Sequence, residues 1–234
     1  MLVAAAVCPC PPLLVPEVAA GAAPELDTAR AACLDAVGVL AASRPDLLVV
    51  VGPGDGLAYP AGGHGSFRGF GVALDVTLGA PDPAAQEPAL ADSLAVGAWL
   101  LDRARWTGVP VEGLAVDGRS PAAACAWTGQ ELAARAERVA LLVMGDGSAC
   151  RTLKAPGYLD ERAEAFDARA AEALGSADLA ALDALDETLA YELKAAGRAP
   201  WQLLSGAARG AGLAGRLLYE DAPYGVGYTV AAWS

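Results

Sequence analysis

The residues of this chain that could do chemistry follow two apolar segments. Cys10 comes shortly after the apolar segment 2–7, and Asp146, Ser148 and Cys150 come directly after a second one. A deprotonated thiol is a nucleophile and a soft metal ligand, whereas a carboxylate moves protons or binds a cation. Both loops are therefore candidates for a functional site, and for Asp146 and Ser148 the alternative is a local turn cap.

The single histidine, His64, lies in the glycine-rich stretch 54–71, which also contains Asp55. An imidazole with an ordinary pKa of about 6.5 suits proton transfer near neutral pH. His64 and Asp55 are a candidate acid/base pair, and a surface histidine without a chemical role is the alternative. The glycines at 52, 54 and 56 lack the G-x-G-x-x-G spacing of a dinucleotide site, which disfavours nucleotide binding.

Three apolar segments are expected to position these residues. The segment 47–51 is fully apolar and runs into Pro53 and Gly54, as a buried strand does before a tight loop, and segments 2–7 and 139–144 are alike. Ligands of open α/β sheets bind beyond the carboxyl ends of the strands. We therefore expect one shared pocket, formed by residues of the three loops and of a later loop: Cys10, Gly54, Asp55, Asp146, Ser148 and Tyr224.

Helical spacing of apolar residues predicts helices between the strands and through most of the second half of the chain. Two strand-like segments, 215–220 and 226–233, flank a turn and predict a closing hairpin. The predicted fold is a single α/β domain over residues 1–234, with a mostly parallel central sheet flanked by helices on both faces.

Composition narrows the classes of partner. The chain has 234 residues, 55% of them hydrophobic and 19% charged, with a net charge of -12. A negative net charge disfavours binding to the phosphates of nucleic acid. No apolar run approaches the roughly 20 residues that span a bilayer. The N-terminus lacks the basic start of a signal peptide, and the five cysteines form no disulfide framework. These features predict a cytoplasmic protein with reduced thiols.

Several short motifs, in order along essentially the whole chain, resemble one family. They resemble the class III extradiol ring-cleavage dioxygenases, in the catalytic-subunit (LigB-like) fold shared with the Memo proteins. The motifs are PCPPLLVPEV at 9–18, PDLLVVVGP at 45–53, GSFRGFG at 65–71, GDGS at 145–148, PW at 200–201 and APYGVGY at 222–228.

The resemblance implies an iron(II) centre held by two histidines and a glutamate, which inserts dioxygen into a catechol ring, and it implies a homodimer. Cys10 stands where the family's first histidine is expected, and Gly54 stands where the second is expected. The glutamate position falls near Ala195, with Glu192 one turn away. The position of the acid/base histidine falls near Cys150.

Three interpretations follow. In the first, the chain is a diverged member without the usual iron site that binds a small molecule, such as an aromatic one, or a protein partner. In the second, Cys10 and Cys150 act as thiolate ligands or redox groups beside His64 and Glu192, with zinc or copper(I) as the preferred metal. In the third, a weakened extradiol site survives. The second requires the Cys10 and Cys150 sulfurs to lie together in one pocket.

Overall fold

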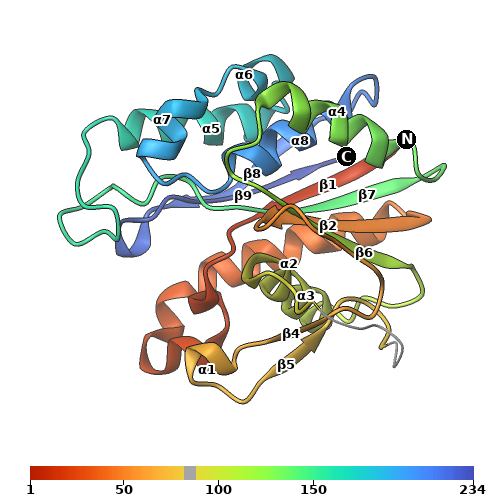
Figure 1. Ribbon diagram of the computed structural model, residues 1–234, viewed down its shortest axis with the longest axis horizontal. Helices are drawn as coiled ribbons and strands as arrows, with labels where there is room; N and C mark the ends of the chain where they lie inside the picture. The colour runs from red at the N-terminus through yellow and green to blue at the C-terminus, as the bar shows by residue number, and fades with distance from the viewer. Residues whose placement is uncertain (82–87) are drawn as a thin grey trace.

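The computed structural model describes residues 1–81 and 88–234, and they form a single α/β domain around a seven-stranded sheet (Figure 1). The strand order is β3-β6-β2-β7-β1-β9-β8, and a separate two-stranded ribbon joins β4 to β5. The strands are β1 (Leu2–Cys8), β2 (Leu47–Pro53), β3 (Ala58–Tyr59), β4 (His64–Ser66), β5 (Asp75–Thr77), β6 (Val111–Val116), β7 (Val139–Met144), β8 (Gly215–Asp221) and β9 (Tyr228–Trp233).

The sheet is mixed, which corrects the expectation of a mostly parallel one. The contacts β6–β2, β2–β7 and β7–β1 are parallel, whereas β3–β6, β1–β9 and β9–β8 are antiparallel. The predicted closing hairpin is confirmed as β8–β9, and it adds two strands to the edge of the parallel core. The short strand β3, formed within the glycine-rich stretch, caps the other edge and was not predicted.

Helices cover both faces of the sheet (Figure 1). One face carries α2 (Asp27–Ala42) and α3 (Asp92–Arg103), and the other carries α4 (Ala122–Ala133), α5 (Ala163–Ser176) and α8 (Arg198–Ala208). The remaining elements are short: α1 (Pro16–Ala19), α6 (Leu179–Asp183), α7 (Glu187–Glu192), η1 (Pro12–Leu14), η2 (Ala20–Leu26), η3 (Arg68–Phe70) and η4 (Pro223–Gly225). No helix of the described residues is long and apolar enough to cross a membrane.

The apolar strands are buried on both faces, and their alternating side chains enter two separate cores. In β2, Val50 enters the core under α2 and α3, whereas Val49 and Val51 enter the core under α5 and α8. This division follows from the two-residue period of a strand. The position of a residue within a strand therefore decides which face of the sheet its side chain lies on.

Helices α4 and α8 approach each other so closely that only glycine fits at their crossing. A Cβ atom at Gly129 would collide with the carbonyl oxygen of Leu203, and one at Gly206 would collide with the carbonyl oxygen of Ala126. Glycine costs stability inside a helix, and here the close approach of the two backbones accounts for it. The crossing braces the second half of the chain against the sheet.

Candidate functional site

Two of the three loops expected to share a pocket meet, those after β1 and β7, because these strands are neighbours and run parallel. The backbone N–H of Cys10 donates to Asp146 Oδ1 at 2.8 Å. The N–H of Gly145 donates to the carbonyl of Cys8 at 2.9 Å, which continues the sheet contact beyond the strand ends. The loops after β1 and β7 are thus joined by a side chain and by the backbone.

Burial perturbs the pKa values of both polar side chains at this junction. It raises the pKa of Asp146 to about 6, although hydrogen bonds from Cys10 act in the opposite direction. Burial also raises the pKa of the Cys10 thiol well above its usual range, and the neighbouring carboxylate of Asp146 raises it further. Cys10 therefore stays a protonated thiol at neutral pH, which makes it a poor nucleophile.

Tyr228 is a third residue near this junction, and it is not one of the residues expected in the shared pocket. It is the first residue of β9, which pairs with β1, and its side chain is 2% exposed. Burial raises its pKa, as do the charges of Asp146 and Cys10. Among the described residues, none hydrogen bonds to its hydroxyl. The available signal in the sequence is its position: Tyr228 lies at the start of the last predicted strand, which was expected to rejoin the sheet.

Gly54 leaves no free space for a ligating side chain in the direction its Cβ would take. A Cβ atom there would lie 2.8 Å from Ala115 Cβ and 3.0 Å from Ala91 Cβ. Ser93, in the first turn of α3, donates its hydroxyl to the carbonyl of Pro53 at 2.7 Å and fixes the helix start against this loop. The beginning of α3 and strand β6 thus occupy the space beside the end of β2.

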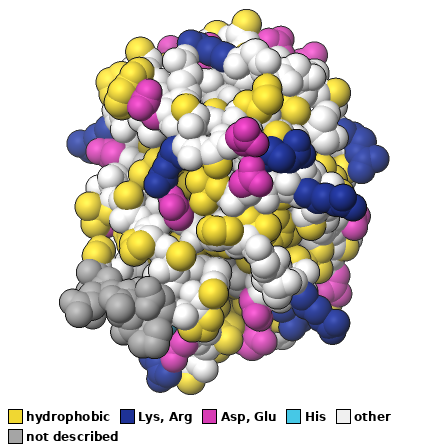
Figure 2. Space-filling model, turned by 90° about the vertical axis from the view of Figure 1, so that its right-hand side faces the viewer, with side chains coloured by type: hydrophobic (Ala, Val, Ile, Leu, Met, Phe, Trp, Pro, Cys, Tyr) yellow, Lys and Arg dark blue, Asp and Glu magenta, His cyan; other side chains and the backbone are white. Residues whose placement is uncertain are grey.

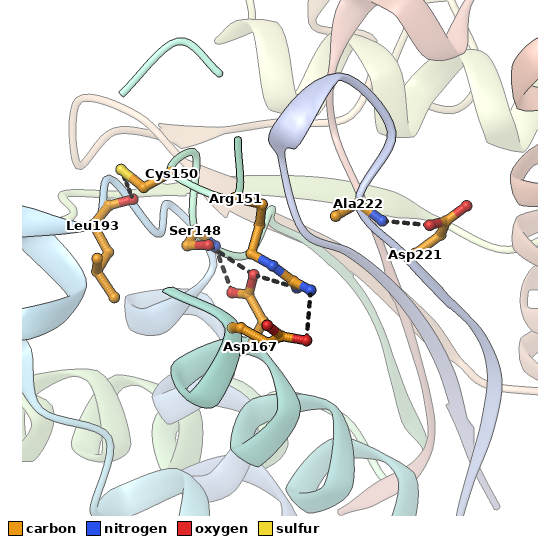
Figure 3. A network of polar contacts seen from close by, with 8 residues as sticks. Ser148, Cys150, Arg151, Asp167, Leu193, Asp221 and Ala222 are labelled. Atoms are coloured by element: carbon orange, nitrogen blue, oxygen red, sulfur yellow. Dashed lines mark hydrogen bonds and ion pairs between the residues drawn. The ribbon is translucent and has the colours of Figure 1, made fainter. Parts of the chain in front are cut away.

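Ser148 belongs to a buried structural network and not to the pocket. Its backbone N–H and its hydroxyl both donate to the carboxylate of Asp167, each at 2.7 Å, and Arg151 donates to the same carboxylate at 3.2 Å (Figure 3). Burial raises the pKa of Asp167, whereas these three donors lower it. The network ties the loop after β7 to helix α5, which is how Ser148 serves the fold.

Cys150 and Cys10 lie in different cores, so the expectation of a shared thiol site is wrong. The Cys150 thiol donates to the carbonyl of Leu193 at 3.4 Å, in the core under α5 and α8 (Figure 3). Cys10 packs in the core under α2 and α3. Glu192, expected to lie beside the two thiols, is engaged elsewhere, because its carboxylate accepts a hydrogen bond from Arg162 at 2.8 Å.

His64 and Asp55 do not form the expected acid/base pair among the described contacts. His64 is exposed on strand β4, where it pairs with Thr77 of β5. The Asp55 carboxylate accepts from the N–H of Leu57 at 3.1 Å and from the hydroxyl of Tyr59 at 3.4 Å. Asp55 therefore caps its own loop, and His64 is exposed on the ribbon of β4 and β5.

Tyr224 lines an open cavity, but the cavity is not the expected shared pocket. None of the other residues expected there is among its lining residues: Cys10, Gly54, Asp55, Asp146 and Ser148. The hydroxyl of Tyr224 donates to Glu25 Oε2 at 2.7 Å, and its charge is among those that raise the pKa of Tyr228. The cavity has a volume of about 730 Å³ and is lined by Arg151, Thr152, Leu153, Lys154, Leu159, Ala222, Tyr224 and Gly225. Two cations and several apolar side chains thus share one wall.

The residues present do not fit the iron centre that the resemblance implies. In residues 1–81 and 88–234, no three histidine, cysteine, aspartate or glutamate side chains are grouped so as to hold a metal ion. At the four expected positions stand a buried cysteine, a glycine without room for a Cβ, an alanine and a cysteine in the opposite core. The carboxylate that is hydrogen bonded at the junction is that of Asp146, which accepts from the N–H of Cys10.

Comparison with known proteins supports the fold. No family model matches the chain, and no curated protein matches it. Among solved structures, an uncharacterized protein, JW3007 of Escherichia coli K12, superposes with a TM-score of 0.59 at 18% identity, over 99% of each chain. The likeness is one of fold. It extends over the whole domain and carries no activity with it.

Proposed function

We propose that this protein is a diverged relative of the class III extradiol dioxygenases that binds a small molecule without iron(II) chemistry. The observation that carries the proposal is the contact at Gly54, where Ala91 and Ala115 occupy the direction of any side chain. A buried cysteine, Cys10, in place of the expected imidazole supports the same conclusion.

The open cavity beside Tyr224 supports a ligand with an aromatic or apolar body and a negative charge. Its volume of about 730 Å³ lies within the range of small-molecule sites. Lys154 has no ion pair among the described residues, so its charge is available to a carboxylate, whereas Arg151 is committed to Asp167 and Glu164. Leu153 and Leu159 supply apolar surface.

Asp146 and Tyr228 do not line this cavity, and Tyr224 is the lining residue whose charge acts on Tyr228. We propose that a hydroxyl group of a ligand that reaches past Tyr224 is recognised by this junction. Tyr228 offers a hydroxyl without a protein partner among the described residues, and Asp146 offers a carboxylate that is mostly ionised above pH 6. A donor and an acceptor at one strand edge suit a phenolic group. No proton transfer or oxygen chemistry is required of either residue.

The test joins a binding measurement to a metal measurement. Protein purified without chelator is analysed for metals before and after anaerobic incubation with iron(II), and 3,4-dihydroxybenzoate is then titrated into it by calorimetry. We expect binding without stoichiometric iron and without oxygen uptake. Lys154→Glu should weaken binding, and Arg216→Glu, the same charge change at an exposed arginine on β8, should not.

Two results would refute the proposal. One is iron bound at one equivalent, lost in Asp146→Ala, with oxygen uptake when the catechol is added. The other is failure of 3,4-dihydroxybenzoate, benzoate and catechol to bind at millimolar concentration, which would remove the small-molecule ligand of this chemical class.

A further inference from the structure

A second cavity lies at the opposite end of the sheet, and it is independent of the site proposed above. It opens between the C-terminal ends of α2 and α3, at the amino ends of the parallel strands, and has a volume of about 530 Å³. Figure 2 shows the side of the molecule that carries these ends, and hydrophobic side chains gather in the middle of that face. The cavity is lined by Leu34, Val37, Gly38, Ala41, Arg44, Pro45, Arg103, Ala104, Arg105, Trp106, Thr107 and Val109.

The body of the cavity is apolar. Leu34 and Val37 contribute one wall from α2, and Trp106 and Val109 contribute the other from the segment that leads into β6. Leu34 is 37% exposed although it lies on the inner side of this hollow. A volume of this size with apolar walls suits one small organic molecule.

The rim of the cavity is cationic in a chain that is strongly acidic overall. Arg44, Arg103 and Arg105 line it, and no aspartate or glutamate is among the lining residues. None of the three arginines forms an ion pair within the described part of the chain, and the Arg103 guanidinium lies 5.7 Å from the centre of the Trp99 ring. Against a net charge of -12, a wall with three cations and no anion is a local reversal of charge.

Cations at helix C-termini also have a structural explanation, which covers only part of this arrangement. They favourably oppose the negative end of the helix dipole. Arg44 and Arg105 follow α2 and α3 with φ values of 49° and 55°, at a position where glycine is the preferred residue. The dipole accounts for a positive charge at each helix end. It does not account for a hollow between the ends, nor for an arginine in place of the glycine at both.

We infer that this cavity binds a small carboxylate with an apolar body, such as a medium-chain fatty acid. The chain would lie against Leu34, Val37 and Trp106, and the carboxylate would accept hydrogen bonds from the arginines at the rim. Arginine matches a carboxylate with two parallel donors, which makes it the preferred partner of such a group.

The charge of the ligand is tested with two probes that share one chain length. Decanoate and decylammonium are titrated into the full chain by calorimetry, below the concentration at which either forms micelles. We expect decanoate to bind. The affinity for decylammonium should be lower by a factor of about ten or more, because the arginines at the rim repel its positive charge. Equal affinity for the two probes, or no binding of decanoate, would overturn the inference.

The location is tested with variants that leave the fold intact. A Cβ at Gly38 meets no atom within 4 Å, so Gly38→Leu extends a side chain into the cavity without a collision at its base and should abolish decanoate binding. The double variant Arg44→Gln/Arg105→Gln should weaken binding about tenfold or more. The matched control is Arg169→Gln, at an exposed arginine on α5, which should bind as the natural chain does.

Thermal unfolding confirms that each variant is folded, and sedimentation reports the oligomeric state. Decanoate binding that survives Gly38→Leu would place the ligand elsewhere and overturn the inference. A dimer that Gly38→Leu dissociates would show that a second copy of the chain fills the cavity, and would overturn it equally.

Discussion

Gly54→Ala is the substitution that most directly tests why the iron site of the resembling family has no counterpart here. The new Cβ would lie 2.8 Å from Ala115 Cβ and 3.0 Å from Ala91 Cβ, closer than methyl groups pack. Overpacking of this kind costs about 1–3 kcal/mol. Because the loop at Gly54 is exposed and can shift, we expect the lower part of that range, about 1–2 kcal/mol.

For a domain of this length such a loss lowers Tm by roughly 2–8 °C. The assay is thermal and urea unfolding of Gly54→Ala beside Gly69→Ala, a nearby glycine whose Cβ would meet nothing within 4 Å. Gly54→His should cost at least as much as Gly54→Ala, because its Cβ meets the same two methyl groups.

A double-mutant cycle assigns the cost to the contact itself. Ala115→Gly removes the nearer methyl group, so Gly54→Ala in that background should lose less than half of what it loses in the natural chain. Unfolding of Gly54→Ala at the same temperature as Gly69→Ala would refute the reasoning, because the space beside the end of β2 would then be free for a ligating side chain.

Three further predictions concern the junction and its supports. The pKa of Asp146 is raised in the folded state to about 6, above an unfolded value of about 3.9, so its contribution to stability is largest at low pH and falls as pH rises from about 4 to 6. Asp146→Asn should remove that component, up to roughly 3 kcal/mol, and a difference curve between the two proteins that is flat over this range would contradict the buried carboxylate. Gly129→Ala or Gly206→Ala should destabilise by about 3 kcal/mol or more in urea unfolding, because backbone atoms obstruct the new Cβ, whereas Gly38→Ala should not. Ser148→Ala should lower the free energy of unfolding by about 1–3 kcal/mol, since the buried carboxylate beside it loses a donor, and an unchanged midpoint would show that Arg151 suffices.

Local patterns in the sequence were enough to predict the central strands and the edge at which their loops meet. Fully apolar runs of strand length become buried strands, because burial on both faces is available only in the middle of a sheet. Parallel strands end at one edge, which is why Cys10 and Asp146 were expected to be neighbours and are hydrogen bonded. The turn between two strand-like segments likewise predicted the hairpin β8–β9.

Which residues lie at the junction depends on contacts between segments far apart in the sequence, and local patterns carry no information about such contacts. Cys10 and Cys150 both follow apolar strands, yet they lie on opposite faces, since the path of a loop after a strand decides which core its side chains enter. Tyr228 reaches the junction only because β9 pairs with β1, a contact between the two ends of the chain. Likewise, a side chain at Gly54 would collide with Ala91, which lies 37 residues later in the sequence, directly before α3.

Periodicity and turn residues act over a few positions, and they therefore select strands, helices and the sheet edge. The side chains that fill the space at that edge come from α3, β6 and β9, and these elements are far apart in the sequence. A short apolar residue such as Ala91 carries no local signal of this role, because its effect depends on the Cβ it faces. The α/β domain and the sheet edge at which the loops after β1 and β7 meet could thus be predicted from residue patterns, whereas the lack of room for a side chain at Gly54 was decided by tertiary packing.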